Sequence, residues 1–232
     1  MRFLAGCALG IVVAVAACTD DLDPPWQLDH DRIIAVRATP PAITAGQTAT
    51  IDALLAHKGS GTSMAAPELA TVVSPAGLAD VLSIRAGNWV VTAPGEDRLA
   101  AARSELQLAP GAPVPLAVGV SYANRTLFAT KTIALGATAD NPRIAGVTVD
   151  GKPPGDTAIV VGKLVKVPLA IDADDAVFDV AWLTSCGTMH DFDLPQAYLK
   201  VETDDPDAGE LGVVLRDAHG GVAWQLWSIR AE

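Results

Sequence analysis

The sequence has little cysteine, few aromatic residues and a shortage of positive charge. Three of its 232 residues are cysteine, and Phe, Trp and Tyr together make up 5% of it. Its 16 basic residues are outnumbered by 27 acidic ones, so the formal net charge is -11. Because phosphate backbones are bound by clustered Lys and Arg, this balance argues against nucleic acid as a partner. The longest apolar run is also shorter than the roughly 20 residues of a membrane-spanning helix.

The first 17 residues have the order of a secretory signal peptide. A short basic start at Met1-Arg2 precedes an apolar stretch and then small residues. The next motif, Val15-Ala16-Ala17-Cys18, resembles the lipobox of bacterial lipoproteins, in which a branched apolar residue and two small ones precede an obligatory cysteine. The resemblance implies cleavage before Cys18, acylation of that cysteine and attachment to membrane lipid. A secretory signal that is cut elsewhere is the alternative.

The residues around the cleavage site also predict the compartment. Thr19 follows the cysteine, where lipoproteins of this family that stay in the inner membrane often carry aspartate. We therefore expect a lipid-anchored protein of the bacterial cell envelope, in the outer membrane rather than the inner one. Cys7 leaves with the signal and Cys18 carries lipid, so Cys186 is the remaining thiol. No internal disulfide can then stabilise the fold.

A short acidic segment separates the predicted anchor from the first strand. Residues 18–31 contain five aspartates and the pair Pro24-Pro25, a charged and stiff composition that indicates a spacer above the membrane. Trp26 interrupts this composition. We expect Trp26 to pack on the first domain, with a position near the lipid surface as the alternative.

The rest of the chain predicts an all-β fold. Half of the residues are hydrophobic, and short apolar runs alternate with Gly, Pro, Asn and Asp clusters, as in a β-sandwich. Apolar residues recur at every second position in residues 49–55, 114–120 and 165–171. Residues 96–108 predict a short helix or an irregular crossover.

Each half of the chain begins with a short strand and ends with a long hairpin, which resembles immunoglobulin-like modules. Trp182 lies where such folds place a core tryptophan, without the flanking cysteine pair of antibody domains. We predict two tandem immunoglobulin-like β-sandwiches, residues 32–138 and 139–232. One larger sandwich is the alternative.

One motif suggests catalysis. The segment Gly61-Thr62-Ser63-Met64-Ala65-Ala66-Pro67 is similar to the segment that carries the catalytic serine of subtilisin-like proteases. The resemblance makes Ser63 a candidate nucleophile and a serine hydrolase an alternative function. His57 is near in sequence, but the family's aspartate and histidine segments are missing, and Glu68 replaces the histidine after the proline. We therefore predict a Gly/Ser/Thr loop here and no enzyme.

Two other groups of polar residues suggest metal or thiol chemistry. Clustered aspartates offer oxygen ligands to calcium, but they lack the glycine and glutamate of an EF-hand, and turn chemistry explains them equally well. They are Asp172, Asp174 and Asp175, and Asp204, Asp205 and Asp207. Cys186 and His190 make only half of a zinc site or of a Cys/His nucleophile. We expect no metal and no cofactor.

The last predicted strand has two apolar faces. Val222, Trp224 and Leu226 share one face, and Trp227 and Ile229 share the other. If the first face is core, the second is an interaction surface or meets the neighbouring domain. The favoured function is a membrane-anchored binding or scaffolding module with an envelope protein or glycan as partner. A structural subunit of an envelope assembly is a further alternative.

Overall fold

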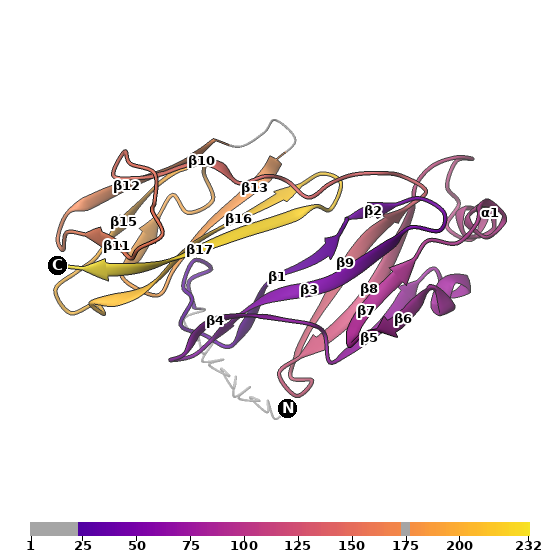
Figure 1. The fold of residues 1–232 in the computed structure, drawn as a ribbon, viewed down its shortest axis with the longest axis horizontal. Helices are drawn as coiled ribbons and strands as arrows, with labels where there is room; N and C mark the ends of the chain where they lie inside the picture. The colour runs from indigo at the N-terminus through magenta and orange to yellow at the C-terminus, as the bar shows by residue number, and fades with distance from the viewer. Residues whose placement is uncertain (1–22, 173–176) are drawn as a thin grey trace, which may run out of the picture.

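The computed structural model describes residues 23–172 and 177–232, which form two β-sandwiches (Figure 1). The predicted signal peptide, Cys18, Asp174 and Asp175 lie outside the described residues. Each sandwich consists of two sheets over its own buried core. No helix in the described part of the chain is long and apolar enough to cross a membrane.

The first sandwich contains nine strands and one α-helix. The strands are β1 (Arg32–Thr39), β2 (Ala42–Ile43), β3 (Thr48–His57), β4 (Gly61–Ala65), β5 (Leu69–Ser74), β6 (Leu82–Arg85), β7 (Asn88–Thr92), β8 (Val114–Tyr122) and β9 (Leu127–Leu135). One sheet has the order β1-β3-β7-β6, with β4 beside β3, and the other has the order β2-β9-β8-β5. A 3-10 helix, η1 (Ala76–Val81), follows β5, and the predicted helix is α1 (Glu96–Glu105) between β7 and β8.

The strand order is that of an immunoglobulin-like sandwich. β1 pairs antiparallel with β3, and the chain then crosses to the other sheet, where β2 pairs parallel with β9. The first strand is thus divided between the two sheets, and the remaining strands follow the order of the two immunoglobulin sheets. The chain therefore folds as tandem immunoglobulin-like domains, as the sequence predicts.

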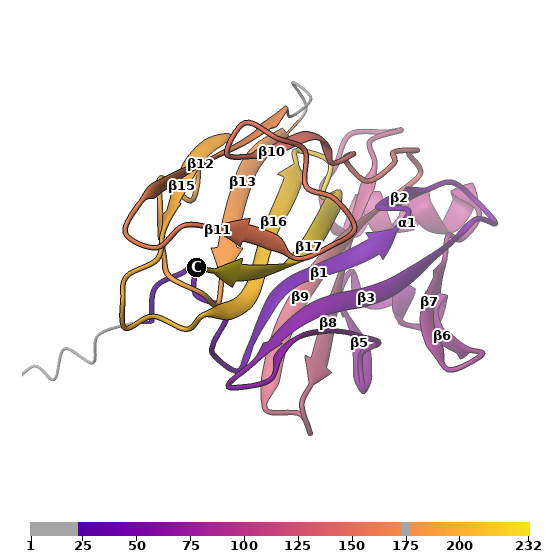
Figure 2. The ribbon, with the colours of Figure 1, turned by 60° about the vertical axis from the view of Figure 1, so that its left-hand side comes forward.

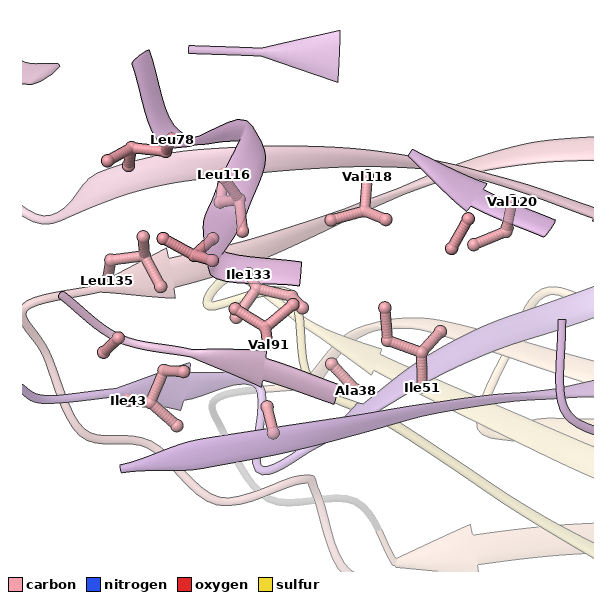
Figure 3. Packing of buried hydrophobic residues seen from close by; sticks show 14 of the residues in the cluster. Ala38, Ile43, Ile51, Leu78, Val91, Leu116, Val118, Val120, Ile133 and Leu135 are labelled. Carbon is pink, nitrogen blue, oxygen red and sulfur yellow. The ribbon is translucent and has the colours of Figure 1, made fainter. Parts of the chain in front are cut away.

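The core of the first sandwich confirms the period-two patterns. Residues Ala49, Ile51, Ala53 and Leu55 of β3 are all buried. Figure 3 shows Ile51 and Val91 on one side of this core and Val118 on the other. A strand alternates its side chains between two faces, so one buried face requires apolar residues at every second position.

The second sandwich repeats this topology. Its strands are β10 (Ala145–Val149), β11 (Ile159–Val161), β12 (Lys166–Asp172), β13 (Val177–Thr184), β14 (Thr188–His190), β15 (Gln196–Lys200), β16 (Ala208–Asp217) and β17 (Val222–Ala231). The sheets have the orders β10-β12-β15-β14 and β11-β17-β16-β13. Trp182 on β13 is fully buried in the core, as predicted, and its Nε1 donates a hydrogen bond to the Leu194 carbonyl oxygen at 3.1 Å.

A third apolar cluster joins the two sandwiches. It is formed on one side by Leu28, Ala35, Leu54 and Ala56, and on the other by Leu183, Val214 and Val222. In Figures 1 and 2, β1 runs between β17 and β9, where the two sandwiches meet. The guanidinium carbon of Arg37 lies 3.9 Å from the ring centre of Trp224, which adds a cation–π contact across this junction.

The segment before β1 differs from the predicted spacer. Leu28 is fully buried between the sandwiches, and its N–H donates to the Thr184 carbonyl oxygen at 2.9 Å. The Thr184 N–H donates to the Trp26 carbonyl oxygen at 2.9 Å, so the segment pairs with β13. Trp26 packs against the core of the second sandwich, not on the first one as predicted. Apolar Trp26 and Leu28 outweigh the surrounding aspartates because burying them removes two large apolar surfaces from water.

Candidate functional site

A groove of about 440 Å³ lies at the junction of the two sandwiches. Its walls are β1 from Ile33 to Val36, β9 from Phe128 to Thr132, and the turn between β16 and β17. Binding sites are frequent at domain interfaces because two rigid surfaces create a concavity there. The groove is therefore a candidate binding site.

One edge of β9 is unpaired along this groove. β8 pairs with every residue of β9 on one side, from Leu127 to Leu135. On the other side β2 pairs only with Ala134 and Leu135. Most of the strand thus lacks a neighbour in its own sheet on the groove side. Unpaired strand edges offer rows of free N–H and C=O groups to other chains.

The orientation of these backbone groups follows from the end of the strand. The Ala134 N–H points away from β8, because it donates to the Pro41 carbonyl oxygen at 3.0 Å. Backbone groups alternate sides along an antiparallel strand. The N–H and C=O groups of Phe128, Thr130 and Thr132 therefore face the groove, and within the described residues they have no hydrogen-bonding neighbour there.

A large aromatic side chain stands at the mouth of the groove. Phe128 is 72% exposed. It lines the groove and also a second hollow of about 270 Å³ on the outer face of the same sheet, beside Leu69 and Thr71. An exposed phenylalanine between two hollows is a typical feature of a binding surface.

Lys131 is the buried cation of the groove. Its side chain is 6% exposed, and its ammonium donates to the Gly220 carbonyl oxygen of the opposing sandwich. Burial is the main cause that lowers the pKa of Lys131 from its ordinary 10.5 to about 8, and Arg216 acts in the same direction while Asp217 opposes it. Lys131 links the two sandwiches at an electrostatic cost.

Replacement of this lysine should stabilise the protein at neutral pH. Below pH 8 the ammonium is charged in the folded and unfolded states, and the folded state bears the cost of burying it. Between about pH 8 and 10.5 the unfolded chain binds the extra proton, so stability rises as that cost disappears. We expect Lys131→Met to raise the free energy of unfolding by about 2 kcal/mol at pH 7, with the loss of one hydrogen bond taken into account. The variant should also lack the increase in stability between about pH 8 and 10.5.

Urea unfolding of the parent and of Lys131→Met at pH 7, 9 and 10.5 checks this prediction. Burial raises the pKa of the Cys186 thiol, so ionisation of this thiol in the unfolded chain lowers the free energy of unfolding as the pH rises. This effect is opposite to that of Lys131. The contribution of Cys186 cancels in the difference between the two proteins. A difference that stays constant across these pH values would contradict the prediction.

The structure brings Ser63 together with two partners that the sequence did not suggest as a group. Ser63 lies on strand β4 and not in a loop, which corrects the sequence-based interpretation. Its Oγ is hydrogen-bonded to His57 Nε2 at 2.8 Å, and His57 Nδ1 lies 3.9 Å from Asp31 Oδ1. The order of groups is that of a serine hydrolase triad.

The backbone around Ser63 does not complete such a site. The Thr62 N–H donates to Glu210 Oε2 at 2.8 Å and so points away from β3. Alternation then turns the Ser63 N–H toward β3, where it cannot stabilise an oxyanion. At 3.9 Å, Asp31 is also too far from the ring to orient it by a hydrogen bond.

These side chains instead connect segments of the fold. Asp31 accepts a hydrogen bond from the Lys58 N–H at 3.1 Å, and Asp29 accepts one from the Gly59 N–H at 2.7 Å. The two aspartates thereby fasten the segment before β1 to the turn between β3 and β4. Glu210 fastens the same hairpin to the second sandwich.

The predicted interaction surface at Trp227 and Ile229 is wrong. Both side chains lie in the core of the second sandwich, with 9% and 1% exposure. The opposite face of β17 carries Val222 and Trp224, which pack at the junction with the first sandwich. Both faces of β17 are apolar because one meets the core and the other meets a neighbouring domain.

Cys186 and His190 do not act as a pair in this structure. Cys186 is buried, its Sγ donates to the Pro206 carbonyl oxygen at 2.9 Å, and burial raises the pKa of its thiol. A thiol held protonated is a poor nucleophile and a poor metal ligand. The His190 ring stacks on the Tyr198 ring, with 4.4 Å between their centres.

Two aspartates of the acidic clusters, Asp205 and Asp207, are used in a turn and in an ion pair. Asp205 Oδ2 accepts a hydrogen bond from the Glu202 N–H at 2.7 Å, and Asp207 pairs with Lys163 at 2.5 Å. In residues 23–172 and 177–232, no three His, Cys, Asp or Glu side chains are grouped so that they could hold a metal ion.

The groove beside β9 was missed at the level of the sequence, although one signal was available. In β9, Ala129 and Ile133 belong to the inward face, and Thr130 and Thr132 to the outward one. Phe128 is the aromatic exception on that outward, polar face. Such an exception indicates contact with something outside the sandwich.

Comparison with known proteins finds distant structural similarities. No protein-family model and no curated protein matches this sequence. Among solved structures, fibronectin(III)-like modules of Clostridium thermocellum CbhA are similar over 85% of this chain and 94% of theirs, at 12% identity and a TM-score of 0.31. The N-terminal Ig1-2 module of Drosophila receptor protein tyrosine phosphatase DLAR is similar over 87% and 98%, at 9% identity and a TM-score of 0.31. Titin domains z1z2, solved with telethonin, have 13% identity and a TM-score of 0.25 over 88% and 98%. Similarities this low do not identify a function.

Proposed function

We propose that this protein is a lipid-anchored module of the bacterial cell envelope that binds or scaffolds a partner without catalysis. The anchor rests on one observation, the sequence Val15-Ala16-Ala17-Cys18 behind an apolar signal. Thr19 favours the outer membrane. The partner is an envelope protein or a glycan, and service as a structural subunit of an envelope assembly is a variant of the same scaffolding role.

The packing of the segment before β1 supports a short tether. Asp23, the first described residue, is five positions after Cys18, so the chain between them spans at most about 18 Å. Within the segment, Trp26 packs against the second sandwich and Leu28 lies in the junction cluster. The junction of the two sandwiches is therefore held close to the bilayer, and not far above it.

The binding role is supported by the surface and not by the distant similarities. The groove, the exposed Phe128 and the free edge of β9 together form a concave region with apolar and hydrogen-bonding groups. The Ser63 arrangement lacks the backbone geometry for acyl transfer. A binding module accounts for the concave region and for the incomplete Ser63 site.

Metabolic labelling with radioactive palmitate tests the anchor. We expect the parent to incorporate the label, and Cys18→Ala to accumulate as unlabelled, uncleaved precursor. Cys7→Ala, which changes the other cysteine of the leader, is the matched control and should be labelled and cleaved as the parent is. Normal labelling of Cys18→Ala would refute the anchor.

A further inference from the structure

We infer that the groove beside β9 binds an extended segment of a partner protein as an added β-strand. The inference deepens the proposed function and rests on it in one respect, that the protein is a binding module. It assigns the class of partner, a polypeptide, and the mode of recognition, through backbone hydrogen bonds to Phe128, Thr130 and Thr132.

The free backbone groups determine the class of ligand. Three N–H donors and three C=O acceptors face the groove, and alternate residues of a strand repeat about every 6.6 Å. An extended peptide presents the same period of donors and acceptors, whereas a glycan or an acyl chain does not. Strand addition to an exposed edge is a general mode of peptide recognition.

The walls of the groove determine how much of a partner can enter. The turn between β16 and β17 overhangs the edge, since Lys131 donates to the Gly220 carbonyl oxygen and a Cβ on Gly220 would lie 3.5 Å from the Thr132 carbonyl oxygen. β1 closes the other side. These walls favour a single extended segment over the edge of a folded sheet, such as that of a second copy of this chain, because a sheet edge would bring its neighbouring strands against them.

The side chains that border the groove determine the preferred sequence. Ile33 and Val36 line it from β1, and Phe128 borders it on the solvent side. We expect apolar or β-branched residues at alternate positions of the bound segment, over roughly five residues or about 16 Å. The formal net charge of -11 favours a segment with Lys or Arg at its ends.

A random library of 12-residue peptides, displayed and selected against the full chain in detergent, provides the probe. We expect enriched peptides with alternating apolar positions that bind Phe128→Ala at least tenfold more weakly than the parent. Because Phe128 is 72% exposed, its loss should leave folding unchanged. Leu164→Ala, which removes a 60% exposed leucine of the second sandwich, is the matched control and should bind normally.

A backbone variant tests the mode of binding. Thr130→Pro removes one of the three free N–H groups, and the fold should tolerate it because that N–H has no partner in the sheet. We expect Thr130→Pro to fold and to lose at least tenfold in peptide affinity. Amide-resolved hydrogen exchange should show slower exchange of the Phe128, Thr130 and Thr132 N–H groups on peptide binding, with little change at Ala129 and Lys131, which already face β8.

Three results would overturn the inference. The first is no enrichment of peptides over an unrelated sandwich protein. The second is that peptides bind Phe128→Ala and Thr130→Pro as tightly as they bind the parent. The third is that slowed amide exchange in β9 does not alternate from residue to residue. Binding of glycan and not of peptide to the same groove would also overturn it. If the protein is lipid-labelled but fails these tests, the proposed anchor stands and the proposed strand binding is refuted. If it passes them but is not labelled, only the anchor is refuted.

Discussion

Trp182→Ala is expected to destabilise the second sandwich by about 3–5 kcal/mol. The indole is fully buried at the centre of the core, and the substitution leaves a large cavity between the sheets. It also removes the hydrogen bond from Nε1, so the Leu194 carbonyl oxygen loses its partner. A loss of this size is comparable to the whole stability of many domains.

Denaturant unfolding, followed by amide exchange in strands of each sandwich, measures this effect. Exchange should accelerate most in β12, β13 and β16, and much less in β3 and β8. Trp89→Ala in the first sandwich is the matched control, because Trp89 is only partly buried at the margin of its core. Trp89→Ala should destabilise the first sandwich by less and should accelerate amide exchange there. Equal acceleration in both sandwiches for Trp182→Ala would contradict separate cores.

Leu28→Ala is expected to cost about 2–5 kcal/mol although Leu28 precedes every strand. The side chain is fully buried and belongs to the junction cluster between the sandwiches. Shortening it leaves a cavity that neither rigid sheet can close. The hydrogen bonds between this segment and Thr184 should then open more often.

Limited proteolysis of residues 24–31 and denaturant unfolding both report on this change. Cleavage in the segment should be faster in Leu28→Ala than in the parent, and the two sandwiches should unfold less cooperatively. Leu164→Ala is the control, because its side chain is 60% exposed and its loss should change neither measurement. An unaltered cleavage rate in Leu28→Ala would show that the segment is a free spacer after all.

The docked segment and the groove are parts of the same junction. At one end of the junction, the segment before β1 is fixed by Leu28, Asp29 and Asp31. At the other end, near the groove, Lys131 donates to the Gly220 carbonyl oxygen. In the proposed binding mode, these junction contacts also position the turn at Gly220 and β1 beside the free edge of β9. Loosening at Leu28 should therefore also weaken peptide binding.

Local patterns in the sequence were sufficient for the class of fold. The alternation in residues 49–55 predicts a strand with one core-facing row, and β3 buries that row, although the junction also covers Leu54 and Ala56 on its other face. Trp182 was correctly assigned to a core strand, and α1 falls within the predicted crossover. These features depend on neighbours one to four residues apart, so side-chain periodicity and turn chemistry are enough to predict them.

Only the tertiary structure decided which faces and edges meet. Residues Trp224 and Trp227 lie on opposite apolar faces of β17, and no periodicity tells which face is core when both are covered. Trp26 and Leu28 stand among aspartates, so their burial depends on a strand, β13, that lies about 150 residues later in the chain. Separation in sequence also hides the groove, because the free edge of β9 is flanked by β1 and by the turn at Gly220, which are remote from it along the chain. The sequence by itself thus determined an all-β chain with two apolar cores and a predicted lipid anchor at Cys18. The burial of long-range surfaces decided the junction, the docked segment and the candidate site.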